Sequence, residues 1–259
     1  MAPIYDFNEF EILAFFLVVM RMSAFVVSWP VFGAPTVPNT LKILFALLMS
    51  MLIFPIVDYS ALNQDLLSTQ IIVLALREVF IGLIFGYLAK FFFFGIRIAG
   101  EIISVTIGLS SSQLFNPAFG GQVTSVEQFK IVVASLFFLA INGHHLLVGG
   151  LIDSFRVIPL SGELLNLDHF QSIGIFMQEI MEIGFSLSAP VLISIFFVNV
   201  GMAVIGRTVP QINVLITSLP VNILVGLFVM TISVPLLIWQ MEGLMELTTS
   251  RLFAFVKEL

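Results

Sequence analysis

The residues of this chain best placed to do chemistry are ionisable side chains inside long apolar segments. Arg77 and Glu78 are neighbours, whereas Arg97 and Glu101 stand four positions apart, the spacing of an ion pair along one helix. Charged groups in apolar segments are costly and often mark proton relays or ion pathways. The pattern allows a proton relay but favours structural ion pairs between packed helices. Arg21 has no partner nearby in sequence, so we expect its partner on another segment.

Metal and covalent chemistry have little support. His144 and His145 are adjacent, and adjacent residues on a helix point about 100° apart, whereas a metal-binding pair needs a spacing of about three or four residues on one face. The chain has no cysteine, which excludes disulfides and thiolate catalysis. It also lacks the HExxH, GxSxG, P-loop and dinucleotide patterns. We therefore expect no enzyme activity, no cofactor and no metal.

An unusual uncharged stretch occupies residues 108–123, between two apolar runs. It is rich in Ser and Gly and carries Leu114, Phe115 and Phe119. Non-helical backbone at membrane depth is tolerated only where protein buries it or water lines it. Two interpretations stay open from the residues alone: a pore loop or plug, and an ordinary surface loop.

The composition places the whole chain in a membrane. Of its 259 residues, 59% are hydrophobic and 10% are charged, and the mean hydropathy is +1.12. Soluble domains carry about 25% charged residues, so this chain has too little polar surface to form a soluble globule. The net charge of −6 argues against strong nucleic-acid binding.

The elements that must hold these residues are apolar helices, because lipid tolerates only helices or closed barrels and the apolar runs do not alternate. A span needs about 20 apolar residues, and the candidate segments are 12–29, 41–57, 71–94, 126–148, 183–205 and 212–239, with a shorter run at 98–109. Pro190, Pro220 and Pro235 are expected to break the later runs, and a Pro/Gly turn at 30–38 separates the first two.

Two further segments have the pattern of amphipathic interface helices, 163–182 and the tail 242–258. The first has Asp168 and Gln171 at the spacing of a capping box. Small residues at Gly82 and Gly86 predict close packing against a partner helix, and those at Gly95 and Ala99 extend the pattern. Basic residues near span ends place Lys42, Lys90, Arg97 and Arg207 on the cytoplasmic side, and the acidic N-terminus and 58–70 outside.

Several short stretches together resemble one family. They are Trp29-Pro-Val-Phe-Gly33 with Val37-Pro38, Phe115-Asn-Pro117, Asn142-Gly-His-His145 with Asp153-Ser-Phe155, and Val209-Pro-Gln-Ile-Asn213. Their order and spacing are similar to those of the FliR family of flagellar export-apparatus proteins and its relatives in virulence type III secretion. The resemblance covers essentially the whole chain.

The resemblance implies an all-α integral membrane protein of helical hairpins. It implies a single export-gate domain over 1–259, with a FliP-like part at 1–182 followed by a FliQ-like part at 183–259. Such a chain joins FliP-like and FliQ-like subunits in a helical ring around a pore, next to FlhB-like and FlhA-like proteins. Its place would be the bacterial inner membrane, at the flagellar basal body.

The resemblance also implies roles for two groups of residues. The loop would be a plug that closes the protein-conducting channel for unfolded flagellar substrates, with Leu114, Phe115, Asn116, Pro117 and Phe119 as its side chains. Pro210, Gln211 and Asn213 would face the export partners. The alternatives are the virulence-secretion counterpart and a secondary transporter with broken helices.

Overall fold

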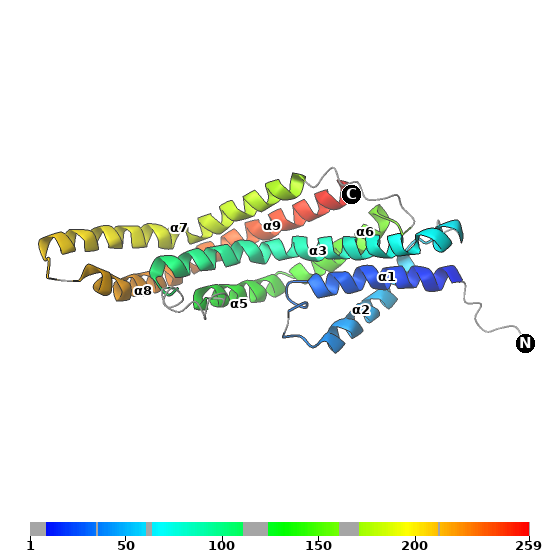
Figure 1. Ribbon diagram of the computed structural model, residues 1–259, viewed down its shortest axis with the longest axis horizontal. Coiled ribbons are helices and arrows are strands. Elements are labelled where there is room, and N and C mark those ends of the chain that lie inside the picture. Colours follow the sequence, from blue (N-terminus) through cyan, green and yellow to red (C-terminus); the bar gives the residue numbers. More distant parts are fainter. Residues whose placement is uncertain are drawn as a thin grey trace, which may run out of the picture. The chain divides into compact units, whose positions relative to one another are not determined.

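Every described element of the computed structural model is a helix or a connection between helices, which confirms the predicted all-α class (Figure 1). The structure describes residues 9–34, 36–60, 64–110, 124–160, 171–211 and 213–258. The elements are α1 (Glu9–Ser28), α2 (Asn39–Ile53), the 3-10 helix η1 (Phe54–Ile56), α3 (Gln64–Ile107), α5 (Ser125–Ala140), α6 (Gly143–Val157), α7 (Gln171–Thr208), α8 (Val214–Ile232) and α9 (Val234–Glu258).

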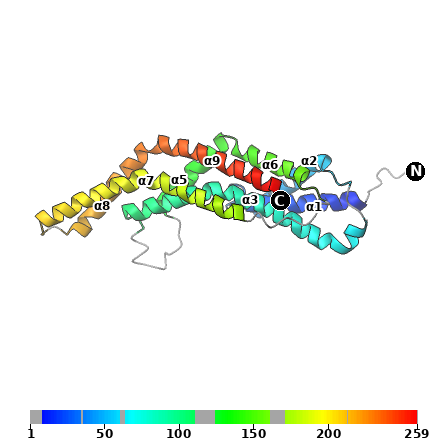
Figure 2. The same ribbon diagram turned by 90° about the horizontal axis from the view of Figure 1, so that it is seen from above.

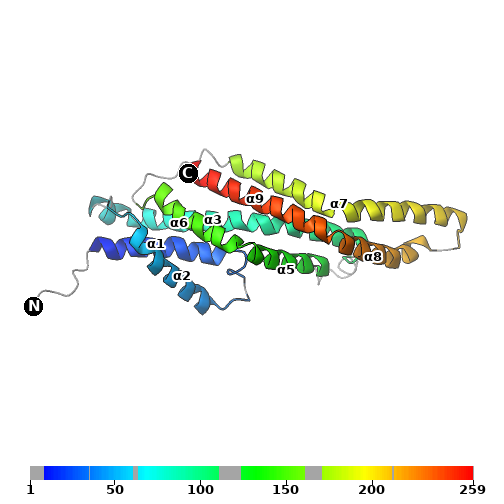
Figure 3. The same ribbon diagram turned by 180° about the vertical axis from the view of Figure 1, so that it is seen from behind.

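Four described helices are long and apolar enough to cross a membrane by themselves, at Phe10–Ser28, Asn39–Ile56, Ile71–Ile107 and Ile173–Thr208. Two helix pairs, α5 with α6 and α8 with α9, pass the same test together but bend by 66° and 61° at a short break. The described part of the chain therefore holds up to six spans. The second bend lies at Ser233, two residues before Pro235, close to the break that the sequence predicts at this proline, and Figure 3 shows the change of direction between α8 and α9.

Two predictions about helix boundaries are wrong. The run at 98–109 is not a separate element, because α3 continues through it to Ile107. The segment 163–182 is not a separate interface helix within the described residues, because residues from Gln171 onward belong to α7 and lead directly into the next span. Asp168, half of the expected capping box, lies outside the described residues. The tail 242–258 is helical, as part of α9.

Two of the three prolines do not break their helices. Pro190 lies inside α7 and Pro220 inside α8. A proline lacks the amide that a helix interior uses, but apolar helices tolerate it where neighbouring groups satisfy the freed carbonyl. Only Pro235, at the second residue of α9, coincides with a break.

The chain forms two compact units. Unit 1 consists of residues 1–91, 142–175 and 247–259, and unit 2 consists of residues 92–141 and 176–246. Three helices contribute to both units, because α3, α7 and α9 each continue across a boundary.

In unit 1, α1 packs against α2 and against the first part of α3 (Figure 1). The contact with α3 depends on Gly82 and Gly86, since a Cβ atom at these positions would collide with the Arg21 carbonyl and with Ser28 respectively. This confirms the predicted small-residue packing and shows that the partner helix is in the same chain. Where α1 ends, Trp29 packs against Phe25 and Phe32, with ring centroids 4.9 and 4.5 Å away and the rings tilted by 34° and 42°.

In unit 2, α7 and α8 form a helical hairpin (Figure 2), and their contacts with the end of α3 and with α5 make the core. That core contains Ile103, Ile107, Val126, Val191 and Ile195. Gly184 and Gly95 bring α7 against α3, because a Cβ at Gly184 would lie 2.8 Å from the Gly95 carbonyl oxygen. One polar pair crosses the hairpin, with Asn222 Nδ2 donating to Asn199 Oδ1 at 3.1 Å.

Candidate functional site

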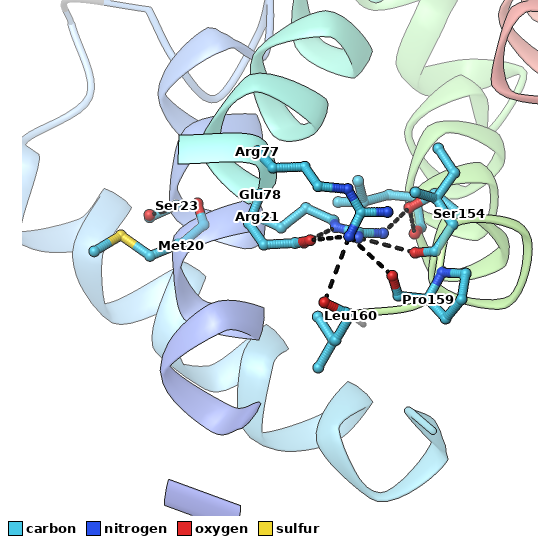
Figure 4. Close-up of polar contacts among 10 residues, drawn as sticks. Met20, Arg21, Ser23, Arg77, Glu78, Ser154, Pro159 and Leu160 are labelled. Atoms are coloured by element: carbon cyan, nitrogen blue, oxygen red, sulfur yellow. Dashed lines mark hydrogen bonds and ion pairs between the residues drawn. The ribbon is translucent and has the colours of Figure 1, made fainter. Parts of the chain in front are cut away.

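The buried charged residues of unit 1 form one network (Figure 4). Arg21 from α1 and Glu78 from α3 are both fully buried, and Arg21 Nε donates to Glu78 Oε2 at 2.5 Å. The Arg21 guanidinium also donates to Ser154 Oγ and to the Ile158 carbonyl, each at 3.0 Å. It lies over the Phe155 ring, 4.1 Å from the centroid. Arg21 thus has its expected partner on another segment.

Arg77 adds a second cation to the same network. Its Nη1 lies 3.5 Å from Glu78 Oε1 and donates to the carbonyls of Pro159 and Leu160 at 3.1 and 3.4 Å. These carbonyls follow the C-terminus of α6, where a helix presents partial negative charge that favours cations. The two arginines therefore join three segments: α1, α3 and the chain just after α6.

This geometry fits a structural role better than a proton relay. An arginine stays protonated in proteins, so two of the three charged groups cannot pass a proton on. Burying a charged group without a partner is costly, and here each charge has a partner from a different segment. We conclude that Arg21, Glu78 and Arg77 fix the packing of unit 1.

A second ion pair occupies unit 2, and it joins two packed helices, as the sequence favours. Arg97 pairs with Glu127 of α5, Nε to Oε1 at 2.8 Å, and not with Glu101 on its own helix. The cause is Gly100, since a Cβ there would lie 2.7 Å from Glu127 Cα, so α5 approaches α3 closely enough to offer its own carboxylate.

Glu127 was not among the predicted residues, although Thr124-x-x-Glu127 has the spacing of a capping box. In the structure, Thr124 caps α5 by accepting a hydrogen bond from the Glu127 amide at 3.3 Å. Lys130 lies on the same buried face of α5.

The predicted plug residues Leu114, Phe115, Asn116, Pro117 and Phe119 lie outside the described residues, so their role stays a prediction. The structure describes how the chain leaves and re-enters this loop. On one side, Gly108 has a φ of 89°, a left-handed conformation that glycine adopts without strain. Next to it, Ser104 Oγ and Ser110 Oγ lie 3.0 Å apart. On the other side, α5 begins at the Thr124 cap.

The residues predicted to face partners are exposed. Pro210 and Gln211 lie in the short connection between α7 and α8, and both are exposed. Asn213 is exposed too and caps α8, with its Oδ1 accepting a hydrogen bond from the Ile216 amide at 3.4 Å. Their contact with partners stays a prediction.

The two histidines follow the bend between α5 and α6. Their ring centroids lie 4.1 Å apart, and Nδ1 of His144 is buried without a hydrogen-bond partner. Within the described ranges, no group of three or more His, Asp or Glu side chains could hold a metal ion.

The sequence of this chain is similar to those of one family of known proteins. The model of the bacterial export proteins, family 1, matches residues 12–248. Flagellar biosynthetic protein FliR of Bacillus subtilis (strain 168) is 31% identical over 239 residues, which cover 91% of each chain. The proteins of the same name from Aquifex aeolicus (strain VF5) and Escherichia coli (strain K12) are 26% and 27% identical. Their alignments cover 89% and 86% of this chain and 88% and 85% of the relative.

Proposed function

This chain belongs to the bacterial export proteins, family 1, and from that membership we propose that it is a membrane subunit of the flagellar protein export apparatus. The observation that carries the proposal is the match over residues 12–248, together with relatives named flagellar biosynthetic protein FliR that align along nearly their whole length. The membrane character agrees with it, since up to six described segments could span a bilayer.

In finer detail, the chain helps to build and close a protein-conducting channel in the bacterial inner membrane, at the flagellar basal body. It does so as an assembly component and not as an enzyme. Residues 1–182 form a FliP-like part and 183–259 a FliQ-like part, and the chain completes a helical ring with FliP-like and FliQ-like subunits. FlhB-like and FlhA-like proteins are its further partners, with Pro210, Gln211 and Asn213 facing them.

The distribution of apolar surface supports assembly with other helices. Only 17% of the most apolar window in Asn39–Ile56 is buried within the chain, and the same share holds for Ile173–Thr208. Large side chains such as Phe196, Phe197 and Phe228 are more than half exposed. Exposed apolar surface of this extent is covered by lipid or by other subunits.

The closed state depends on the loop at 108–123. We assign the plug to Leu114, Phe115, Asn116, Pro117 and Phe119, whose side chains are mostly apolar and uncharged and so exclude water and ions. The turn at Gly108 and the cap at Thr124 support this assignment, because both ends of the loop are fixed to helices of unit 2.

The test is deletion of the gene in the source bacterium. We expect loss of swimming in soft agar and loss of flagellar subunits from the culture medium, both restored by a plasmid copy. If swimming persists and a set of virulence effectors fails to leave the cell, the chain is the virulence-secretion counterpart. If secretion is intact and uptake of a small solute fails, the chain is a secondary transporter and the proposal is wrong.

A further inference from the structure

One exposed face of α3 in unit 2 carries two charged side chains between apolar ones. Phe94, Arg97, Glu101 and Val105 are all exposed and follow one another at intervals of three or four residues. Residues at this spacing lie on the same face of a helix. The opposite side of α3 packs into the core, where Ile103 is buried. The part of the chain that the structure describes therefore leaves this face uncovered.

Glu101 has no counter-charge among the described residues. The cation four positions before it, Arg97, pairs with Glu127 of α5 instead, with Nε and Oε1 2.8 Å apart. That contact uses one of the five N–H donors of Arg97, and the Arg97 side chain is still 53% exposed. The face thus presents a cation and an anion about one helical turn apart, and both can bind a further group.

Lipid is a poor cover for this face. Arg97 and Glu101 both lie inside Ile71–Ile107, a segment apolar enough to cross a membrane. Ionised side chains in such a segment are costly to expose to hydrocarbon, so they face protein or a water-filled cavity. The neighbours favour protein, because Phe94 and Val105 expose apolar side chains about one turn to either side. Apolar surface around one charged position is typical of a contact between helices in which the charge fixes the register.

We propose that this face binds a helix of a neighbouring subunit, and that this helix supplies a basic side chain to the Glu101 carboxylate. Charge complementarity identifies the partner, since an unpaired carboxylate in a buried contact requires a Lys or Arg. The same helix covers the apolar side chains of Phe94 and Val105. The inference does not depend on what the apparatus exports. It requires only that the chain assembles with another membrane protein.

Photo-crosslinking in the source bacterium tests this contact in the assembled protein. The full-length chain carries p-benzoylphenylalanine in place of Val105, and ultraviolet light joins that position to a protein that touches it. We expect one adduct with a membrane protein. Glu101→Lys should reduce the adduct by about tenfold or more, the effect of losing one side of a buried charge pair. Glu242→Lys is the matched control, an exposed glutamate of α9 in the same unit, and should leave the adduct unchanged.

A charge exchange tests the chemistry of the contact. Mass spectrometry of the adduct identifies the partner segment, and replacing its basic residue by Glu should restore the adduct in the Glu101→Lys strain. The proposal is wrong if the adduct survives Glu101→Lys, or if the partner segment has no basic residue. It is also wrong if normal amounts of the chain give no protein adduct, because lipid or water would then cover the face.

Thiol labelling separates a protein contact from a water-filled cavity. The natural chain has no cysteine, so Glu101→Cys provides a single thiol. In open membrane fragments, where both aqueous sides are accessible, a charged maleimide should label this thiol only after the membranes are dissolved in denaturant. Labelling without denaturant would show that water covers Glu101 and would overturn the proposal.

Discussion

Arg21 Nε lies 2.5 Å from Glu78 Oε2, and this buried contact connects α1 to α3 across 57 positions of sequence. The glutamate carries the single negative charge in a network with two buried arginines, Arg21 and Arg77. The three side chains are therefore not equivalent, and substitutions at these positions should lower the unfolding free energy by different amounts.

Glu78→Gln should be the most damaging change in this network. It leaves two arginines buried without a counter-charge, and breaking a buried pair in this way costs about 3–5 kcal/mol of unfolding free energy. Arg77→Gln should cost less, because the closer pair between Arg21 and Glu78 survives. Thermal unfolding in detergent, followed by tryptophan fluorescence, measures both.

An exposed ion pair provides the control for that series. Arg156 and Asp153 lie 3.5 Å apart with side chains that are 72% and 55% exposed. Arg156→Gln should change the unfolding free energy by less than about 1 kcal/mol. Equal losses from Glu78→Gln and Arg77→Gln would show that the carboxylate is not the centre of the network.

The contact between α1 and α3 gives a second prediction. Gly82→Ala places a methyl group against the Arg21 carbonyl and 2.9 Å from Ala24 Cβ, and backbone cannot move aside cheaply. We expect a loss of about 1–3 kcal/mol. Gly149→Ala in α6 meets nothing within 4 Å and should stabilise the helix by up to about 1 kcal/mol. The same thermal unfolding experiment measures both variants. If Gly82→Ala leaves the unfolding free energy unchanged, α1 and α3 are farther apart than this contact requires.

A surface hydrogen bond makes a third, pH-dependent prediction. Tyr59 donates its hydroxyl to Glu11 Oε1 at 3.2 Å. This bond and the nearby negative charge raise the pKa of Tyr59 above its usual 10.0. Because the folded pKa is raised, the contribution to stability is complete below the unfolded pKa and is lost as pH rises through the folded one.

Absorbance of tyrosinate tests this shift directly. Tyr5→Phe with Tyr87→Phe leaves Tyr59 as the single tyrosine of the chain, and its titration midpoint should lie above 10.0. Adding Glu11→Gln should lower the midpoint toward that value. A midpoint that does not respond to Glu11→Gln would show that the contact is not formed in solution.

The plug assignment predicts a leak. Deleting 113–120 should let small ions cross the membrane of cells while the complex still assembles, because the apolar side chains that exclude water are gone. Growth in high salt and membrane-potential dyes report the leak, and a tagged chain reports assembly. Phe115→Leu, which keeps an apolar side chain, should stay tight. If cells that carry the 113–120 deletion keep a membrane that is tight to small ions, this loop is not the plug.

Helix positions follow from the sequence more readily than helix continuity does. The apolar runs predict the spans because each must satisfy its own backbone in lipid. The gap at 94–98 between two predicted apolar runs looks like a break since Arg97 interrupts the apolar pattern, yet α3 passes through it, because arginine is a good helix former. Pro190 likewise looks like an end but lies inside α7. In both cases an interruption of the apolar pattern is not an interruption of the helix.

The charged site was predictable only in part. That Arg21 needs a partner follows from the cost of a buried charge, but its choice of Glu78 depends on packing through Gly82 and Gly86. The role of carbonyls at Ile158, Pro159 and Leu160 could not be predicted, because a backbone acceptor has no sequence signature. The roles proposed for Pro210, Gln211, Asn213 and the plug residues rest on the family resemblance, because uncharged loop residues have no spacing that identifies a partner.

The central claim is that this chain works inside an assembly whose other subunits cover its exposed apolar helices. Affinity purification of the full-length chain from membranes in mild detergent tests that claim most directly. We expect two small membrane proteins, FliP-like and FliQ-like, to co-migrate with the chain through size-exclusion chromatography. A stable, isolated chain that transports a small solute after reconstitution by itself would contradict it.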